Sequence, residues 1–290
     1  MSFCQKCGNE CGVIGFFSWC LIFIASMLLV ACDSDSSSGT DSGELSSSSV
    51  ISSSSGAKEN TSSSSFNSLS SSSNTEVKVA WDYLNPNITY GEITDDRDGQ
   101  VYKTVVIGTQ TWMAQNLNYA DSAAMTNLNG NSWCYNNNAD SCAKYGRLYT
   151  WTTAMNIAGS YKSASASAVI SSPHQGVCPA EWHIPTDEER TILENAVGGL
   201  DSVGTMLKST SGWANEGNGS DTYGLSVLPA GYYSVGVFYR IKDEAKFWST
   251  GEYGTTRAHY WGFVHNVAFG LVGYNFKHTA YPVRCLKDSE

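Results

Sequence analysis

The sequence predicts an α+β fold for residues 77–290, built from short antiparallel strands, two to three helices and long loops. Charged residues make up only 15% of the chain and Gly is plentiful, at 27 residues, which favours turns over long surface helices. Runs of β-branched and aromatic residues recur between turn residues, as expected of short strands. The clearest helix signal is a capping-box sequence at residues 186–189.

The first strands follow a turn-forming segment at residues 95–99. Residues 101–107 are rich in β-branched side chains, Gly108-Thr109 turns the chain, and residues 110–113 complete a hairpin. Later strands are expected over 232–241, 246–250, 259–267, 271–277 and 282–286. In the first of these, alternation predicts one core-facing set: Tyr233, Val235, Val237, Tyr239 and Ile241.

Three segments are candidate helices. Residues 148–157 form one, and a short helix is possible near 202–208. The strongest begins after Thr186, whose hydroxyl can accept from the Glu189 amide while Glu189 reaches back, and it should end at Gly198-Gly199. Its expected apolar stripe is Ile192, Leu193, Ala196 and Val197.

Residues 1–31 have the features of a bacterial secretory signal. Lys6 precedes a nearly continuous apolar run from 13 to 31, and Cys32 ends it in a lipobox-like sequence. We therefore expect cleavage before Cys32, lipidation of Cys32, and an anchored lipoprotein of the cell envelope, on the outer membrane and facing outward. The alternative is an uncleaved signal anchor, since the run is about long enough to cross a bilayer. Both place the rest of the chain outside the cytoplasm.

Residues 32–76 predict a disordered stalk, because 22 of the 44 residues from 33 to 76 are Ser. Such a segment buries too little apolar surface to offset the entropy of ordering it. The net charge of −10 disfavours nucleic acid as a partner, since that affinity depends on neutralising phosphates. The same charge is ordinary for a soluble surface.

Four cysteines remain in residues 77–290, namely Cys134, Cys142, Cys178 and Cys285. An even number in an exported domain implies disulfides, and four cysteines allow three pairings. The short spacing favours Cys134–Cys142, which leaves Cys178–Cys285 as the second bridge.

Several segments resemble the Fibrobacter succinogenes major paralogous domain family. They are RDGQVYKTVVIGTQTWMAQNLNY at 97–119, GVCPAEWHIPTDEE at 176–189, YGLSVLPAG at 223–231, FWST at 247–250 and VRCLKD at 283–288. Arg190 and Tyr281-Pro282 depart from the family pattern. The resemblance implies a C-type-lectin-like fold, related to that of sulfatase-modifying enzymes, and surface lipoproteins of fibre-degrading or gut-type bacteria. It implies no established activity.

No catalytic motif is apparent, and the cysteine pair of sulfatase-modifying enzymes has no counterpart. His183, between Trp182 and Ile184, is expected to be a packed core residue. A calcium site would need oxygen ligands at short spacing. Two clusters offer them, Asp95, Asp96 and Asp98, and Asn215, Glu216, Asn218 and Asp221. Turn chemistry also explains both clusters, so no metal or cofactor is predicted.

Aromatic side chains are the remaining functional signal. Flat aromatic faces suit sugar rings and protein partners, although core packing is the commoner role. The candidate ligand-binding residues are Trp213, Tyr232, Tyr253, Tyr260 and Trp261. We expect a non-catalytic surface module that binds polysaccharide or a surface protein. The alternatives are an enzyme acting on glycans or exported proteins, and a structural envelope lipoprotein.

Overall fold

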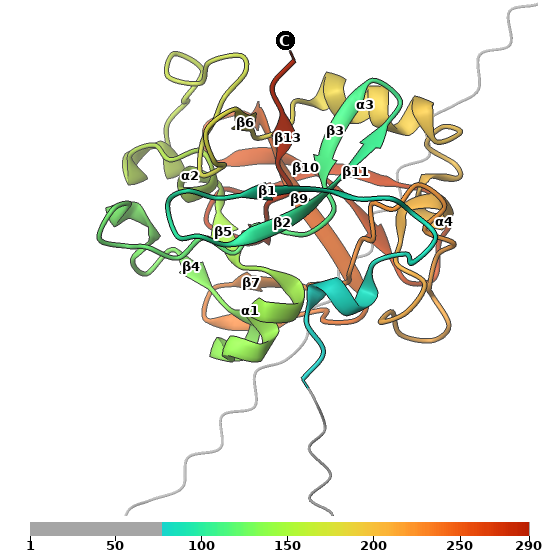
Figure 1. Cartoon of the computed structure of the whole chain (residues 1–290). Coiled ribbons are helices and arrows are strands. Elements are labelled where there is room, and N and C mark those ends of the chain that lie inside the picture. Colours follow the sequence, from blue (N-terminus) through green and yellow to red (C-terminus); the bar gives the residue numbers. More distant parts are fainter. Residues whose placement is uncertain (1–76, 290) are drawn as a thin grey trace, which may run out of the picture. The chain divides into compact units, whose positions relative to one another are not determined.

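The structure is a computed structural model that describes residues 77–289 (Figure 1). The expected signal peptide, Cys32 and the Ser-rich segment lie outside the described residues. Within residues 77–289, no helix is both long and apolar enough to span a membrane.

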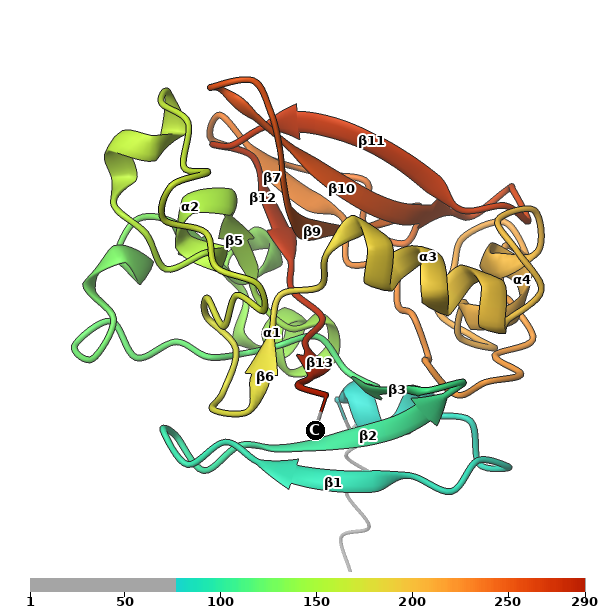
Figure 2. The same ribbon diagram turned by 90° about the horizontal axis from the view of Figure 1, so that it is seen from above.

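The named strands pair antiparallel throughout and form three sheets (Figures 1 and 2). The first contains, in order, β1 (Gly91–Thr94), β2 (Val101–Ile107), β3 (Gln110–Met113), β13 (Leu286–Lys287) and β6 (Trp182–His183). The second contains β4 (Ser132–Trp133), β5 (Leu148–Thr150), β12 (Ala280–Pro282), β7 (Tyr232–Ser234) and β8 (Val237–Tyr239). The third contains β11 (Leu271–Phe276), β10 (Arg257–Val264) and β9 (Glu244–Tyr253).

The helices are short. The α-helices of the described residues are α1 (Ala139–Tyr145), α2 (Trp151–Ala154), α3 (Asp187–Ala196) and α4 (Val203–Leu207). The 3-10 helices are η1 (Ala80–Tyr83), η2 (Thr126–Leu128), η3 (Tyr135–Asn137) and η4 (Gly159–Lys162). The described residues are mostly antiparallel sheet with few, short helices, which is compatible with the predicted α+β class, while the lectin-like topology stays a prediction.

Helix α3 begins as its sequence predicts. The Thr186 hydroxyl accepts from the Glu189 amide at 3.1 Å, and the Glu189 carboxylate accepts from the Thr186 amide at 2.9 Å. Leu193 and Val197 are fully buried beneath the helix, whereas Ile192 is 47% exposed. The expected apolar stripe is therefore narrower than the sequence suggested.

The expected strand over residues 232–241 is wrong, because the chain reverses inside it. Val235 and Gly236 form a two-residue turn with φ values of 47° and 84°, so Ser234 pairs with Val237. Positive φ at both positions matches the type I′ turn, whose twist suits an antiparallel hairpin. The turn inverts the predicted face: Tyr233 packs beside Phe238, and Val235 is 80% exposed.

Two further expectations need correction. Residues 148–157 do not form one helix, because residues 148–150 are strand β5, which pairs with β12 and β4, and α2 adds only about one turn. Residues 282–286 are not one strand but link the end of β12 to the start of β13. In both cases pairing with distant strands overrides the local pattern.

Both expected disulfides are confirmed. Cys134 pairs with Cys142, and Cys178 pairs with Cys285 across 107 residues of sequence. Cys178 and Cys285 are fully buried in a core that lies on one side of β9 and β10. A second core lies on the other side of these strands, beneath α3.

Candidate functional site

Three exposed aromatic side chains gather on the third sheet and form what we call the aromatic strip: Tyr253, Tyr274 and Phe276. Their exposed fractions are 51%, 44% and 41%. Tyr274 and Phe276 alternate along β11, and Arg257 of β10 lies opposite both Tyr253 and Phe276. Because paired residues share a face of a sheet, the three rings point the same way.

The rings of the strip are held by one another and by a cation. Those of Tyr253 and Tyr274 are stacked, with centroids 3.8 Å apart and planes 2° from parallel. The Arg257 guanidinium lies 4.7 Å from the Phe276 ring centroid and 5.5 Å from that of Tyr274. Mutual packing of this kind fixes the rings while a large part of each side chain stays in solvent.

Helix α3 determines where the strip is exposed. It covers the same face of the third sheet, and Figure 2 shows β10 and β11 extending past its N-terminal end. Phe247 and Trp261 lie beneath the helix and are buried. Tyr253 and Tyr274 lie beside His259, which contacts the first residue of the helix, and they stay about half exposed.

A polar pair, which we call the dyad, adjoins the strip. Asp187, the first residue of α3, lies with one carboxylate oxygen 2.5 Å from His259 Nδ1 and accepts from the Ser249 hydroxyl at 2.8 Å with the other. His259 Nε2 has no hydrogen-bond partner among residues 77–289, and the side chain is 32% exposed. The carboxylate thus orients an imidazole whose other nitrogen can accept a hydrogen bond or a proton.

Gly251 provides the space that the dyad needs. A Cβ at this position would lie 2.7 Å from His259 Nδ1 and 2.8 Å from the Asp187 carboxylate. Any side chain here would press on the pair and displace one of its members.

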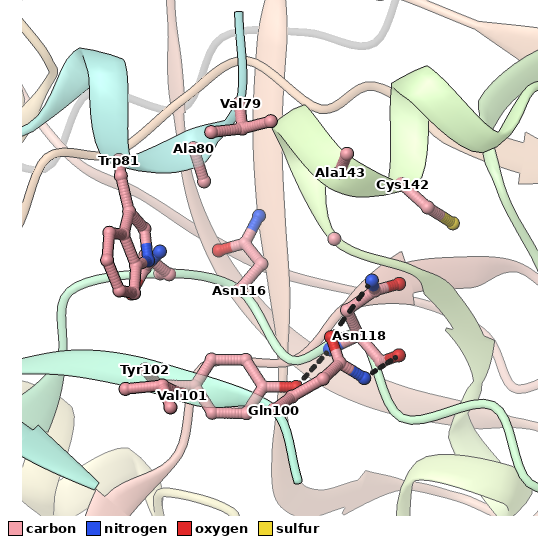
Figure 3. Close-up of a pocket in the computed structure, with 12 residues that line it drawn as sticks. Val79, Ala80, Trp81, Gln100, Val101, Tyr102, Asn116, Asn118, Cys142 and Ala143 are labelled. Carbon is pink, nitrogen blue, oxygen red and sulfur yellow. Dashed lines mark hydrogen bonds between the residues drawn. The ribbon is translucent and has the colours of Figure 1, made fainter. Parts of the chain in front are cut away.

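A cavity of about 350 Å³ opens between η1, the start of β2 and α1, on a different part of the fold from the strip (Figure 3). Its polar lining consists of amide groups, one phenol and one indole: Gln100, Gln115, Asn116, Asn118, Tyr102 and Trp81. Trp81 is 44% exposed and stands at one side of the cavity, facing the amides. We call this space the amide pocket.

His183 is a buried core residue, as expected, at 3% exposure. Its Nδ1 lies 2.6 Å from the Asp288 carboxylate and its Nε2 lies 3.0 Å from that of Glu189. Burial lowers the pKa of His183, but the hydrogen bonds to Glu189 and Asp288 outweigh burial and leave that pKa raised. Burial raises the pKa of Glu189, and its bonds to His183 and Thr186 outweigh this and leave it lowered. These hydrogen bonds hold the C-terminal segment against the start of α3, and we call His183, Glu189 and Asp288 the His183 cluster.

The acidic clusters considered for calcium use their best-placed carboxylates in other ways. The Asp95 carboxylate pairs with the Arg97 guanidinium at 2.7 Å, and the Asp221 carboxylate accepts from the amide and hydroxyl of Ser226 at 2.7 Å each. Burial raises the pKa of Asp221 to about 7. Within residues 77–289, no group of three or more His, Cys, Asp or Glu side chains is arranged to hold a metal ion.

Two of the five predicted ligand-binding residues are core residues. Trp213 is 6% exposed and donates from Nε1 to the Val227 carbonyl at 2.9 Å. Trp261 is 2% exposed, packed against Trp112 and Phe247. Surface roles for Trp213 and Trp261 are therefore wrong, because each completes the core beneath α3.

The other three predicted residues lie apart: Tyr232 is on β7 of the second sheet, and Tyr253 and Tyr260 point to opposite faces of the third sheet. Tyr232 and Tyr260 are half-buried and both set their rings edge-on to Tyr281. Tyr253 is exposed and belongs to the strip. The sequence prediction missed Tyr274 and Phe276, although alternation of Val272, Tyr274 and Phe276 with Gly273 and Asn275 was a visible signal of an aromatic face.

Comparison with known families gives a match. A family model described as the Fibrobacter succinogenes major domain matches residues 105–287. No similar curated protein and no similar solved structure was found. The matched segment includes the strip, the dyad and all four disulfide cysteines, and it covers more than half of the chain. The chain therefore belongs to the Fibrobacter succinogenes major domain family.

Proposed function

We propose that this protein is a non-catalytic surface module that binds polysaccharide on the aromatic strip. The observation that carries the proposal is the set of three large aromatic rings, each at least 41% exposed, ordered on one face of a sheet. Aromatic rings that stay in solvent in this way commonly mark binding sites.

The form of the strip favours a polysaccharide over a folded protein partner. A stable protein interface buries about 800 Å² on each side, far more than three side chains provide. A sugar chain needs flat apolar surfaces for its ring faces and polar groups for its hydroxyls. The rings of the strip supply the apolar surface, and Arg257 and His259 at its edge supply the polar groups.

Export and anchoring belong to the same proposal. A lipid on Cys32 and a Ser-rich stalk over residues 32–76 would hold the strip outside the cell, within reach of an extracellular polymer. The lectin-like topology that the family resemblance implied also stays within the proposal. Incorporation of radiolabelled palmitate that is lost in Cys32→Ala would support the anchor, and equal labelling of both proteins would refute it.

Binding can be tested by retention of the full chain on insoluble cellulose and xylan, with a glycan array to survey other chains. Stacking on one ring is worth about 0.5–1.5 kcal/mol, so Tyr253→Ala and Tyr274→Ala should each weaken binding about 2- to 10-fold. Tyr239→Ala, a tyrosine 39% exposed on the second sheet, is the matched control and should bind normally. A protein that binds no glycan at all, or a strip double variant that binds like wild type, would refute the proposal.

The dyad favours a second candidate function, an enzyme acting on glycans or exported proteins. An imidazole oriented by a carboxylate, with its other nitrogen free, is the arrangement of a general base. His259→Gln removes the base but keeps a polar side chain of similar reach. Turnover of a polysaccharide or peptide that disappears in His259→Gln would establish the enzyme, whereas binding without turnover in both proteins would establish the module.

A further inference from the structure

We infer that the amide pocket is a second carbohydrate site, which takes one uncharged sugar residue and works independently of the aromatic strip. The inference rests on the proposed function only in taking the ligand to be a carbohydrate. The pocket and the strip are built from different elements, and Trp81, Gln100 and Tyr102 precede the segment matched by the family model.

The size of the pocket selects a small ligand. At about 350 Å³ it lies at the lower end of the range for small-molecule sites, roughly 300–1,000 Å³. A concave space of this size suits a single ring at a chain end or branch. The strand that borders it, β2, is already paired on both sides, by β1 and β3, so a peptide cannot add to it as a further strand.

The chemistry of the lining selects an uncharged, hydroxyl-rich ligand. No Asp, Glu, Lys or Arg lines the pocket, and the nearby Lys103 ammonium is paired with the Glu92 carboxylate, so phosphate, carboxylate and cationic ligands find no unpaired partner charge. Two of the four amides, Gln115 and Asn118, are instead fixed so that one donor and one acceptor stay available. Gln115 Oε1 accepts from the Lys103 amide at 2.6 Å, which leaves its Nε2 as a donor. Asn118 Nδ2 donates to Gln100 Oε1 at 3.1 Å, which leaves its Oδ1 as an acceptor.

The floor of the pocket is held rigid from below. Asn116 Oδ1 accepts two hydrogen bonds from the buried Arg284 guanidinium, at 2.9 and 2.7 Å, and its Nδ2 donates to the Tyr145 carbonyl at 2.8 Å. Gly146 approaches so closely that a Cβ there would lie 2.6 Å from the Asn116 Cβ. Such a floor needs little reorganisation when a ligand enters.

The aromatic wall of the pocket is oriented as well. The Lys103 ammonium lies 4.6 Å from the centre of the Trp81 indole. Trp81 Nε1 has no hydrogen-bond partner among residues 77–289 and remains available to a ligand. An indole beside an array of amides offers an apolar surface for the C–H face of a sugar and hydrogen bonds for its rim.

Saturation-transfer difference NMR tests the inference directly, with the full chain in detergent and a panel of glucose, xylose, mannose, galactose and cellobiose. Glucuronate and galacturonate are the charged controls. At least one neutral sugar should give a transfer signal that Trp81→Ala abolishes. Gln115→Glu, which keeps the acceptor for Lys103 but removes the free donor, should weaken binding at least 10-fold. Both variants should melt within a few degrees of wild type, as checked by circular dichroism.

The double variant Tyr253→Ala/Tyr274→Ala separates the two sites. It should lose retention on insoluble polysaccharide and keep the transfer signals of the small sugars. Absence of transfer from every neutral sugar, equal transfer from the uronates, or a signal insensitive to Trp81→Ala would overturn the pocket and leave the strip intact. Retention of the double variant on insoluble polysaccharide at the wild-type level would overturn the strip and leave the pocket intact.

Discussion

Removing the Cys178–Cys285 bridge should cost about twice as much stability as removing Cys134–Cys142. In the chain-entropy description, a cross-link stabilises by restricting the unfolded chain, and the effect grows with the length of the closed loop. A separation of 107 residues gives about 4.8 kcal/mol, and a separation of 8 residues gives about 2.5 kcal/mol. For a domain of this size, each kcal/mol shifts Tm by about 2–4 °C, so the expected losses are about 10–20 °C and 5–10 °C.

The comparison uses two double alanine variants, so that no unpaired thiol remains in residues 77–290. Differential scanning calorimetry gives the two Tm values, and urea unfolding gives the free energies of unfolding. Reduction of the wild-type protein should lower Tm at least as far as the Cys178→Ala/Cys285→Ala variant, because it opens both bridges. Equal losses in the two variants, or a larger loss from the short loop, would refute the entropic account.

The remaining predictions concern the His183 cluster, the turn at Val235-Gly236 and the dyad. Because the pKa of His183 is raised in the folded protein, its contribution to the free energy of unfolding is present below its ordinary pKa of 6.5 and declines as pH rises through its pKa in the folded protein. Because the pKa of Glu189 is lowered, the contribution of Glu189 declines as pH falls below 4.5. The Tm gap between wild type and His183→Asn should therefore be widest between about pH 4.5 and 6.5; a gap that widens towards pH 9 would contradict this. Val235→Asn should stabilise the protein in urea by up to about 1 kcal/mol, because Asn tolerates the φ of 47° that strains a β-branched residue; a loss of stability would mean that the valine is selected by packing. Gly251→Ala should destabilise by about 1–3 kcal/mol and change the NMR chemical shifts of the His259 imidazole, and wild-type values for both would show that the dyad tolerates the added methyl group.

Local signals predicted those parts of the fold that local chemistry determines. The capping box fixed the start of α3 because both of its hydrogen bonds are made within four residues. The hairpin at Val235 escaped prediction because a β-branched residue at positive φ is disfavoured, and its alternation with Gly236 reads as a continuous strand. Pairing of the two hairpin strands, and of β7 with the distant β12, holds the turn in place at that local cost.

Two of the three strip residues, Tyr274 and Phe276, escaped prediction for a different reason, which is geometric. Trp261 and Tyr274 lie on the same face of one sheet, so alternation in the sequence assigns them the same surroundings. Trp261 is buried and Tyr274 exposed because α3 covers one part of that face and begins, at Asp187, beside the other. The boundary between core and binding surface is therefore set by the docking of a helix whose first residue comes 87 positions before Tyr274 (274 − 187). A sequence pattern can nominate aromatic residues on such a face, but only the position of the helix end decides which of them a ligand can reach.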